Sequence, residues 1–336
     1  MAELSSKGFI PEVRVLCGLP ASGKSTEALK WLKGEPNRRV RINYDDLRKE
    51  MFGADWTWNR KDENAVQARA VQMFEDALKL GMSVIIDNTN LSAKVRQSWL
   101  DRALVHNIEA QVDEIGSSTP IWDLIERDSK RGQNRVGRAV IERMALFNGF
   151  IDWNDRETYP NEGFVICDLD GTLADISHRR KFVDGTIRCS ACGDCLPPNI
   201  DPGPETLHAE CNAPLTTKKD WKSFFANVAD DALNAPVAEL LDLFADNGYH
   251  ILLVSGRPIT PCGIPTEEWL QRHEVRYDHL FMRQGGDSRA DTIVKREILD
   301  LLPIDRIDYV LDDRSSVVQM WRDAGLFVLQ VDKGDF

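Results

Sequence analysis

Short apolar runs alternate with longer amphipathic stretches along this chain. The first half has four short runs with β-branched residues that resemble strands, at 13–18, 39–43, 83–90 and 108–116. Two stretches with helical periodicity lie among them, at 25–33 and 64–80. Strands that alternate with helices in this way predict a parallel sheet with helices on both faces.

A second series of the same kind follows in the second half. The segment 152–163 is polar and turn-rich, and we place a domain boundary there. Beyond it, three apolar runs each end in polar residues, at 164–175, 249–258 and 306–314. We therefore expect an α/β chain of two doubly wound parallel-sheet domains, at 10–155 and 160–336. In open parallel sheets, active sites lie at the carboxyl ends of the strands, so the polar tips of these runs are where chemistry is expected.

Composition and charge narrow the class of protein. Hydrophobic residues make up 42% of the chain and charged residues 29%, which is typical of a soluble globular protein. No apolar run reaches the length of a membrane span, and the first residues lack the regions of a signal peptide. The net charge of −12 argues against a protein that coats nucleic acid. An enzyme that grips one strand end needs only a local cluster of Arg and Lys.

The seven cysteines are an odd number, and most of them form no disulfide-like array. We therefore expect a cytoplasmic protein with reduced thiols. Cys17 and Cys167 lie in predicted buried strands, where a small apolar thiol packs well, and Cys262 is expected in the core or at the surface.

Residues 18–26, GLPASGKST, fit the phosphate-binding pattern G-x-x-x-x-G-K-[ST]. The motif follows a predicted strand and opens a predicted helix, which is the context that the pattern requires. Its backbone amides are expected to wrap phosphate groups, while Lys24 reaches the β- and γ-phosphates and the Ser25 hydroxyl binds Mg²⁺. The residues that we expect to bind ATP are Gly18, Gly23, Lys24, Ser25, Thr26 and Arg127.

Acidic residues stand at the tips of the next two predicted strands. Asp45, in INYDDLR, could orient and deprotonate an acceptor hydroxyl, or it could cap the following helix, and spacing alone does not decide. Arg48, one helical turn further on, could bind an acidic substrate. Asp87, in DNTN, could help to hold Mg²⁺ or orient the acceptor.

The basic segment 125–135 is predicted to be helical, with Arg127 and Arg131 four residues apart on one face. Such a run is usually a solvated face of a helix. Phosphoryl transfer also needs an arginine over the transferring group, and we expect Arg131 to serve there.

The second half carries a different kind of phosphate chemistry. Asp168, in DLDGT at a strand tip, is placed to attack phosphorus as a carboxylate nucleophile and to form an aspartyl-phosphate. Asp170 can protonate the leaving alkoxide and later deprotonate the hydrolytic water. A bound Mg²⁺ would relieve the repulsion between these two carboxylates, so both are expected to contact the metal.

Further residues extend this second set in chain order. Ser255, in SGR, offers a hydrogen bond to phosphate, and Lys295 lies on a predicted helix. Asp312 and Asp313, in LDDR, are acidic ligands for Mg²⁺. Together with Asp168-x-Asp170-x-Thr172, they resemble the four signature motifs of haloacid-dehalogenase-type phosphatases.

The order of the two halves extends the resemblance. A P-loop domain followed by such a phosphatase resembles the phage-type polynucleotide 5′-kinase/3′-phosphatase, a family that heals RNA and DNA ends. The segments that carry the resemblance are GLPASGKS, INYDDLR, IIDNTNL, RDSKRG, DLDGTLA, VSGR, QGGDSRADTIVKREI, DDRSSVVQMWR and the terminal GDF. The resemblance implies an N-terminal P-loop kinase and a C-terminal haloacid-dehalogenase-like phosphatase.

For the kinase half, the resemblance implies that Asp45 is the general base for a 5′-hydroxyl. Arg48 would hold the phosphate next to that hydroxyl, and Arg131 would stabilise the transition state. For the phosphatase half, the residues implied to bind substrate or complete its acidic site are Arg179 or Arg180, Arg257, Lys295 and Asp291.

The resemblance also implies a reaction pair. Ends that carry a 5′-OH and a 3′-phosphate would become 5′-phosphate and 3′-OH ends, which a ligase can seal. ATP and Mg²⁺ are the implied cofactors, RNA or DNA ends the implied partners, and a homotetramer the implied assembly. Two alternatives stay open: both chemistries could act on small nucleosides or sugars, or the chain could be an RNA-binding scaffold.

The segment 183–219 departs from that family. It falls in the expected cap over the phosphatase site, about 176–232. The pairs Cys189-x2-Cys192 and His208-x2-Cys211 have the spacing of a tetrahedral structural Zn²⁺ site, and Cys195 could replace His208. A redox-active pair and unligated thiols are the competing interpretations.

Overall fold

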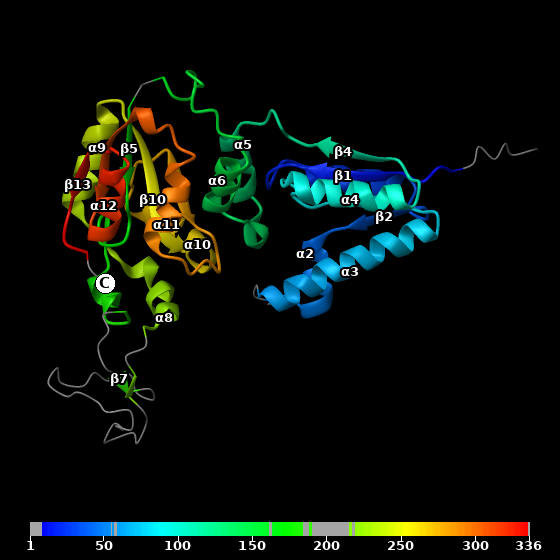
Figure 1. Cartoon of the computed structure of the whole chain (residues 1–336), viewed down its shortest axis with the longest axis horizontal. Helices are drawn as coiled ribbons and strands as arrows, with labels where there is room; N and C mark the ends of the chain where they lie inside the picture. The colour runs from blue at the N-terminus through cyan, green and yellow to red at the C-terminus, as the bar shows by residue number, and fades with distance from the viewer. Residues whose placement is uncertain are drawn as a thin grey trace, which may run out of the picture. The chain divides into compact units, whose positions relative to one another are not determined.

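The computed structural model describes most of the chain, namely residues 9–54, 56, 59–160, 163–183, 188–189, 215–216 and 219–334. The chain forms two compact units, residues 1–136 and 137–336 (Figure 1). Among the described residues, no helix combines the length and the apolar character that a membrane crossing demands.

The first unit is built on a four-stranded parallel sheet with strand order β2-β3-β1-β4. Its strands are β1 (Val13–Cys17), β2 (Arg39–Ile42), β3 (Ser83–Ile86) and β4 (Ala110–Glu114). Its helices are α1 (Lys24–Gly34), α2 (Tyr44–Phe52), α3 (Arg60–Lys79), α4 (Ala93–Val105) and α5 (Ile121–Ser129). The four predicted runs are therefore confirmed as strands, and their carboxyl ends meet at one edge of the sheet.

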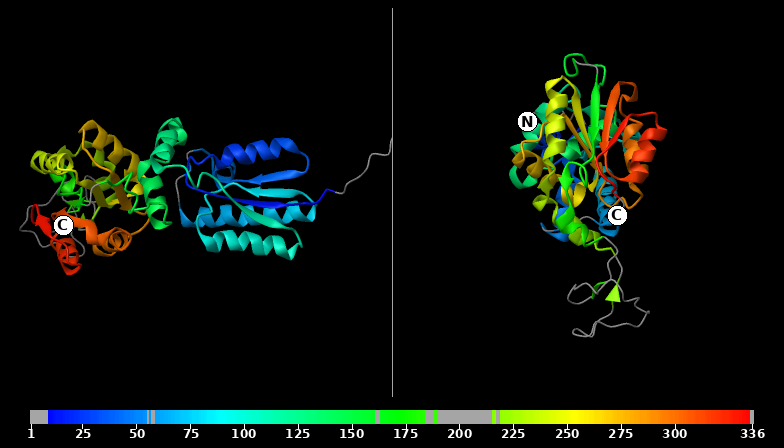
Figure 2. Two further views of the ribbon diagram at one scale, coloured as in Figure 1. Left: turned by 90° about the horizontal axis from the view of Figure 1, so that it is seen from above. Right: turned by 90° about the vertical axis from the view of Figure 1, so that its left-hand side faces the viewer.

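Alternation along the strands fills both faces of this sheet. Val13 and Val15 of β1 point to the face where Phe74 of α3 is fully buried, and α4 packs there too. Leu16 points to the other face, against Trp31 of α1. Figure 2 shows α1 on one side of the sheet and α3 and α4 on the other. This two-faced burial is the arrangement expected for parallel strands.

The second unit has a five-stranded parallel sheet with strand order β11-β10-β5-β12-β13. Its strands are β5 (Phe164–Cys167), β10 (His250–Pro258), β11 (His279–Arg283), β12 (Ile307–Asp312) and β13 (Val328–Gln330). Its longer helices are α6 (Arg138–Phe147), α9 (Ala235–Asp246), α10 (Ile259–Arg272), α11 (Asp291–Leu299) and α12 (Ser315–Asp323). The expected fold class, two parallel-sheet α/β domains, is confirmed.

Helices cover both faces of this sheet as well. Ile166 of β5 packs with Trp321 of α12, and Cys167 packs on the opposite face with Trp269 of α10. Figure 2 shows α9 and α10 on one side of the strands and α11 and α12 on the other. Cys262 and Cys17 are buried thiols too, so all three described core candidates pack inside the protein.

Helix α6 belongs to the second unit, which places the division between the units before this helix. We expected the boundary at 152–163, but α6 packs against β11 and α10 of the second unit. Glu142 is fully buried and accepts a hydrogen bond from the amide of Leu280 at 2.8 Å, while Arg143 donates to the carbonyl of Met282 at 3.0 Å. These side chains pair with the edge of β11, and the structure therefore divides the chain at 136/137.

Small elements stand over the carboxyl ends of the second sheet. They are β6 (Ala174–Asp175), α7 (Ser177–Arg180), α8 (Trp221–Ala226), the 3₁₀ turn η2 (Val228–Asp230) and β9 (Ala232–Leu233). The backbone of β7 (Arg188–Cys189) pairs with β8 (Leu215–Thr216). The other proposed zinc ligands, Cys192, Cys195, His208 and Cys211, lie outside the described residues.

Candidate active sites

The phosphate-binding loop between β1 and α1 holds a buried lysine. Lys24 Nζ donates to the carbonyl oxygens of Gly18 at 2.9 Å and Leu19 at 2.7 Å. Burial lowers the pKa of Lys24 to about 8; the nearby carboxylate of Asp87 opposes this shift, and the charge of Arg131 adds to it. The ammonium is thus held by carbonyl groups where phosphate oxygens would compete for it.

Two glycines of this loop meet different requirements. A Cβ on Gly18 would lie 2.4 Å from the carbonyl oxygen of Ile115, so only glycine allows the close approach of the two segments. Gly23 precedes α1 with φ at +99°, a conformation that side chains disfavour. The loop shape that presents its amides therefore depends on both positions.

Ser25 and Asp87 come together as expected for a metal site. The Ser25 hydroxyl donates to Asp87 Oδ1 at 3.3 Å, and Asp87 is 1% exposed. Arg41 Nε also donates to this carboxylate, at 2.8 Å. A hydroxyl and a carboxylate beside the phosphate-binding loop are hard oxygen ligands that fit Mg²⁺. Thr26, the next residue, is exposed.

Asp45 lies in the first turn of α2, with its side chain 76% exposed. The helix is capped by Asn43, whose side chain accepts from the amide of Asp46 at 3.0 Å, so the capping alternative for Asp45 is wrong. Arg48 donates to Asp45 at 2.6 Å and also binds Glu63 at 2.7 Å. Half-buried Arg48 therefore links the exposed carboxylate of Asp45 to that of Glu63.

The basic segment does not continue as one helix. α5 ends at Ser129, and Arg131 lies in the turn before the 3₁₀ helix η1 (Gly132–Asn134), so the prediction of a shared face with Arg127 is wrong. The turn is held by buried Asp128, which pairs with Arg131 at 3.2 Å. Arg131 nevertheless lies close enough to the phosphate-binding lysine to lower its pKa, whereas Arg127 is exposed on α5.

The second site is a buried acidic cluster at the ends of β5 and β12. Carboxylate oxygens of Asp168, Asp312 and Asp313 lie within 4.8 Å of one another, and all three residues are buried. Lys295 Nζ lies 2.8 Å from Asp168 and 2.7 Å from Asp312. Burial raises the pKa of Asp168 well above its usual range, Lys295 opposes this, and the neighbouring carboxylates add to it.

Asp313 completes the acidic cluster. Burial, followed by the charge of Asp312, raises the pKa of Asp313 to about 6. A Cβ on Gly171 would lie 2.3 Å from its carboxylate, and one on Gly334 would lie 1.8 Å away. The two glycines make the space that this side chain occupies. Three crowded carboxylates facing a single lysine fit a divalent cation, and Asp168, Asp312 and Asp313 would hold Mg²⁺.

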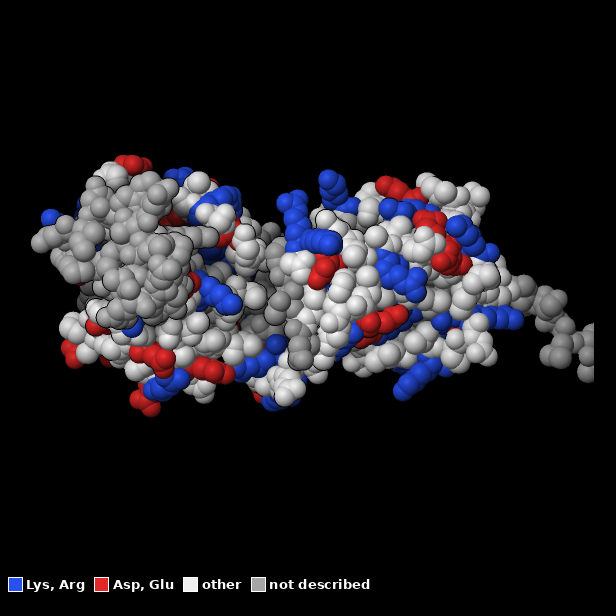
Figure 3. All heavy atoms as spheres, turned by 90° about the horizontal axis from the view of Figure 1, so that it is seen from below, with Lys and Arg blue, Asp and Glu red and all other residues white. Residues whose placement is uncertain are grey.

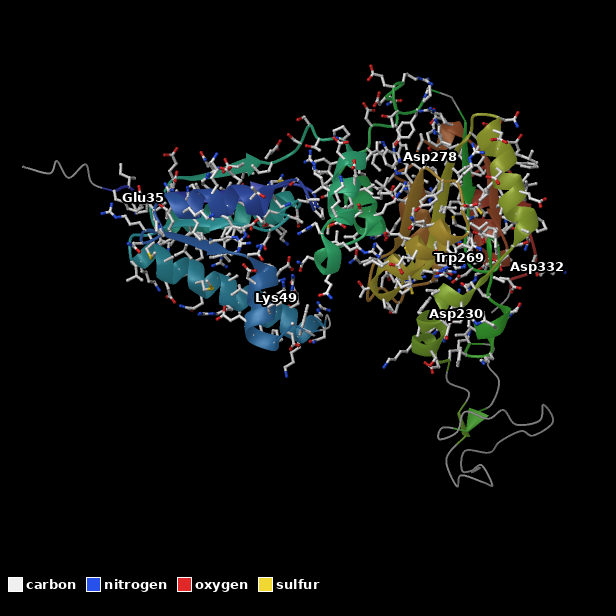
Figure 4. All side chains as sticks on the ribbon, turned by 180° about the vertical axis from the view of Figure 1, so that it is seen from behind. Glu35, Lys49, Asp230, Trp269, Asp278 and Asp332 are labelled. Carbon is white, nitrogen blue, oxygen red and sulfur yellow. The ribbon has the colours of Figure 1, made fainter. Side chains whose placement is uncertain are left out.

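Asp170 belongs to a separate network of buried charges. Its carboxylate accepts from Arg179 at 2.6 Å and Arg257 at 2.7 Å, and both guanidiniums are fully buried. Asp231 binds the same two arginines, with Oδ1 2.6 Å from Arg179 Nε and Oδ2 2.5 Å from Arg257 Nη2. The backbone of Asp231 is fixed in turn, because Trp269 Nε1 donates to its carbonyl at 2.7 Å. Figure 4 labels Trp269 and Asp230, the residue that precedes Asp231, and so shows where this network lies.

The network sets the charge state of Asp170. Burial alone would raise the pKa of this carboxyl, but Arg257 and Arg179 outweigh burial and lower it to about 2. Asp170 is therefore an ion-paired carboxylate in this arrangement. The predicted role as proton donor requires the arginines to release it when a substrate phosphate attracts their charge.

A cavity of about 410 Å³ opens above the acidic cluster. Among the predicted residues, Asp168, Asp170, Asp291 and Lys295 line it. Arg179, Arg257 and Ser255 are fully buried and are not among its lining residues, and the Ser255 hydroxyl accepts from the amide of Arg257 at 3.1 Å. Of the two candidate arginines on α7, Arg179 lies in the charge network and Arg180 is exposed.

Three arginines that line the cavity were not predicted as site residues, namely Arg283, Arg289 and Arg314. Arg283 at the end of β11 and Arg314 after β12 both pair with Asp291, which also lines the cavity, whereas Arg289 pairs with Asp287. A Cβ on Gly256 would lie 2.5 Å from Asp291, so this carboxylate also packs against the backbone of β10. Arg283 could have been found as a charged residue at a strand tip. Asp231 gave no such signal, because it precedes a two-residue strand.

The fold and these sites define the class of protein. A P-loop domain with Lys24, Ser25 and Asp87 precedes a haloacid-dehalogenase-like domain whose acidic cluster holds Asp168. A family model for the polynucleotide kinase PNKP phosphatase domain matches residues 216–336, and one for an AAA domain matches residues 13–147. The chain thus joins a P-loop kinase-type domain to a phosphatase domain of the polynucleotide kinase type. Nothing in these matches favours the phage enzymes over others of this type.

Solved structures with related sequences span both halves or one of them. The chain is 26% identical to a protein of the Pnkp1/Rnl/Hen1 RNA repair complex, over 100% of each chain, with a TM-score of 0.37. It is 21% identical to the Mycobacterium tuberculosis APS kinase CysC, over 37% of this chain and 71% of that one, with a TM-score of 0.30. A haloacid-dehalogenase-superfamily hydrolase from Ehrlichia chaffeensis is 18% identical, over 50% and 86%, with a TM-score of 0.29.

Proposed function

We propose that the protein heals nucleic-acid ends, phosphorylating 5′-OH ends with ATP and removing 3′-phosphates. The observation that carries this proposal is the buried cluster of Asp168, Asp312 and Lys295, which lies under a cavity. The domain that holds this cluster matches polynucleotide kinase phosphatases, and the same chain contains a P-loop. Lys and Arg side chains are interspersed with acidic ones over the face in Figure 3, so the net charge does not preclude strand contacts.

In the phosphatase reaction, a carboxylate oxygen of Asp168 attacks phosphorus, and the bond from phosphorus to the 3′-oxygen breaks. The leaving oxygen takes a proton from Asp170, and water then hydrolyses the aspartyl-phosphate. Lys295 neutralises charge at the reacting centre, and a bound Mg²⁺ would offset the remaining negative charge. In the kinase reaction, Asp45 takes the proton of the 5′-hydroxyl as its oxygen bonds to the γ-phosphorus of ATP, and the bond from that phosphorus to ADP breaks. Lys24 and Arg131 stabilise the transferring phosphoryl group and the ADP that leaves.

The test uses RNA and DNA strands that carry a 5′-OH and a 3′-phosphate, incubated with ATP labelled at the γ-phosphate. We expect label at the 5′ end and release of inorganic phosphate from the 3′ end. Lys24→Ala should remove only the first activity and Asp168→Asn only the second. Turnover of nucleosides or sugars without any action on strands would favour the small-molecule alternative. RNA binding without either activity would favour a scaffold.

We also propose that Cys189, Cys192, His208 and Cys211 bind a structural Zn²⁺, with Cys195 as the alternative ligand. Their spacing alone supports this site. Metal analysis of the purified protein should give about one zinc per chain, and the Cys189→Ala/Cys192→Ala variant should lose it. A metal-free native protein would remove this proposal and leave the two enzyme activities unaffected.

The products of the proposed reactions are substrates for a nucleic-acid ligase, which we propose as the enzyme acting next. The homotetramer implied by the family resemblance stays a prediction, which sedimentation of the purified chain would test.

A further inference from the structure

The walls of the cavity above Asp168 differ in chemistry. One wall is aromatic and consists of Trp221, Phe224 and Phe225, all from the short helix α8. Elsewhere the lining includes Arg283 and Arg314. The cavity thus combines apolar ring surface, cationic groups and the carboxylates that would attack phosphorus.

Helix α8 is anchored so that one of its rings stays accessible. Phe224 is 1% exposed, packs with Ile176 and Val183, and lies 4.2 Å from the Arg179 guanidinium. Its amide donates to the carbonyl of Asp220, which precedes the helix, at 3.0 Å. Trp221, on the same helix, is 41% exposed. The helix is therefore fixed by one aromatic residue while another faces the cavity.

The rings of Trp221 and Phe225 stack on each other and form one aromatic cluster in the cavity wall. Their ring centroids are 5.7 Å apart and their planes differ by 23°. The ammonium of Lys219 lies 5.6 Å from the centroid of Trp221 and adds positive charge beside it. An indole left this exposed costs hydrophobic free energy in water, so an aromatic ligand that covered it would gain that energy.

We propose that Trp221 and Phe225 form the subsite for the terminal nucleobase of a 3′-phosphorylated strand. This inference rests on the proposed phosphatase function and names the part of the substrate that the aromatic wall recognises. Every base has a flat π-face that stacks on aromatic side chains, with little dependence on sequence. A sugar phosphate would have no group to place there. The scissile phosphate would then lie over Asp168, and the base would stack on the rings of Trp221 and Phe225.

The experiment compares two strands that differ only in the last nucleotide. Both carry a 3′-phosphate, but one ends in an ordinary nucleotide and the other in an abasic residue. For the wild-type protein, kcat/KM should be roughly 5- to 150-fold lower on the abasic strand, which is the range expected for one stacked base. Trp221→Ala should show a similar loss on the ordinary strand and little further loss on the abasic one.

Two further variants control for folding and for exposed aromatic residues in general. Trp221→Phe should recover much of the activity on the ordinary strand. Phe327, 60% exposed in the same unit, serves as the matched control, and Phe327→Ala should leave both strands unaffected. An equal loss on both strands for Trp221→Ala, or no loss on either, would overturn the subsite. A wild-type protein that releases phosphate from neither strand would overturn the proposed function itself, and the subsite with it.

Discussion

The two candidate sites differ in how their charges are neutralised. In the phosphatase site, Asp170, Asp231, Arg179 and Arg257 neutralise one another in the interior, and Lys295 lies between two buried carboxylates. In the kinase site, Asp45 is largely exposed and pairs with Arg48. The charges of the second site are therefore paired in the interior, whereas Asp45 of the first site is largely exposed.

This difference has energetic consequences. Breaking a buried ion pair by removing one partner costs about 3–5 kcal/mol, because the remaining charge stays buried. An exposed pair contributes only about 0.2–1 kcal/mol. Substitutions in the phosphatase site should therefore change both stability and activity, while substitutions of exposed kinase residues should change activity alone.

Asp168→Asn should have the largest effect on activity. Loss of the nucleophile should reduce release of 3′-phosphate by about 10⁴-fold or more, with the kinase unchanged. Because the carboxylate is crowded by two others, the variant should unfold at the same or a higher temperature in EDTA. Mg²⁺ should raise the melting temperature of the wild type more than that of the variant. If the variant were less stable than the wild type in EDTA, repulsion among the three carboxylates would not be the dominant interaction in this cluster.

Asp45→Asn should separate activity from stability in the kinase half. Phosphorylation of 5′-OH ends should fall by about 10²–10⁴-fold, the range for loss of a general base. The free energy of unfolding, measured with urea, should change by no more than about 0.5 kcal/mol, as it does for substitutions at other exposed positions. Lys49→Gln, an exposed change on the same helix, is the matched control and should retain activity. Full kinase activity in Asp45→Asn would exclude Asp45 as the base.

Asp231→Asn should test the stability of the buried network. The substitution keeps the shape of the side chain but leaves two buried guanidiniums with one carboxylate. We therefore expect the free energy of unfolding of this unit to fall by about 3–5 kcal/mol. Phosphatase activity should fall with it, and kinase activity should remain. Asp242→Asn is the control, because Asp242 is 54% exposed and lies 3.9 Å from Arg276. Equal effects of the two substitutions would show that the network adds no stability.

The pH dependence of nucleotide binding should give the smallest effect. Because burial lowers the pKa of Lys24 to about 8 from its ordinary 10.5, the free protein loses this charge as pH rises through about 8. The affinity for ATP should therefore weaken above pH 8, by up to about tenfold per pH unit. The unfolded chain keeps the proton up to higher pH, so this residue stabilises folding increasingly between pH 8 and 10.5. Calorimetric titration of the Lys24→Met variant with ATP should show weak binding whose affinity does not fall as the pH rises above 8.

The sequence predicted the two parallel sheets, because strands and helices follow local patterns. The P-loop pattern predicted a loop between a strand and a helix, and Lys24 and Ser25 lie where β1 leads into α1. The aspartates at the ends of β5 and β12 meet as the topology of a parallel sheet requires. Asp231 was missed because its partners lie 52 and 26 residues away in sequence. The end of α5 was missed although Gly132, with φ at +57°, lies three residues beyond it, because the charged run around this glycine was predicted as one helix. Buried Asp128 holds the turn by accepting from the amide of Val136 at 3.0 Å.

The position of α6 has a practical consequence for dividing the protein. A phosphatase fragment that began at residue 160 would lack the helix whose Glu142 and Arg143 pair with β11. An uncovered edge strand of buried residues invites pairing with other molecules, so we expect such a fragment to aggregate on a sizing column. A fragment that begins at Gly137 would carry its own edge protection and should elute as a discrete species.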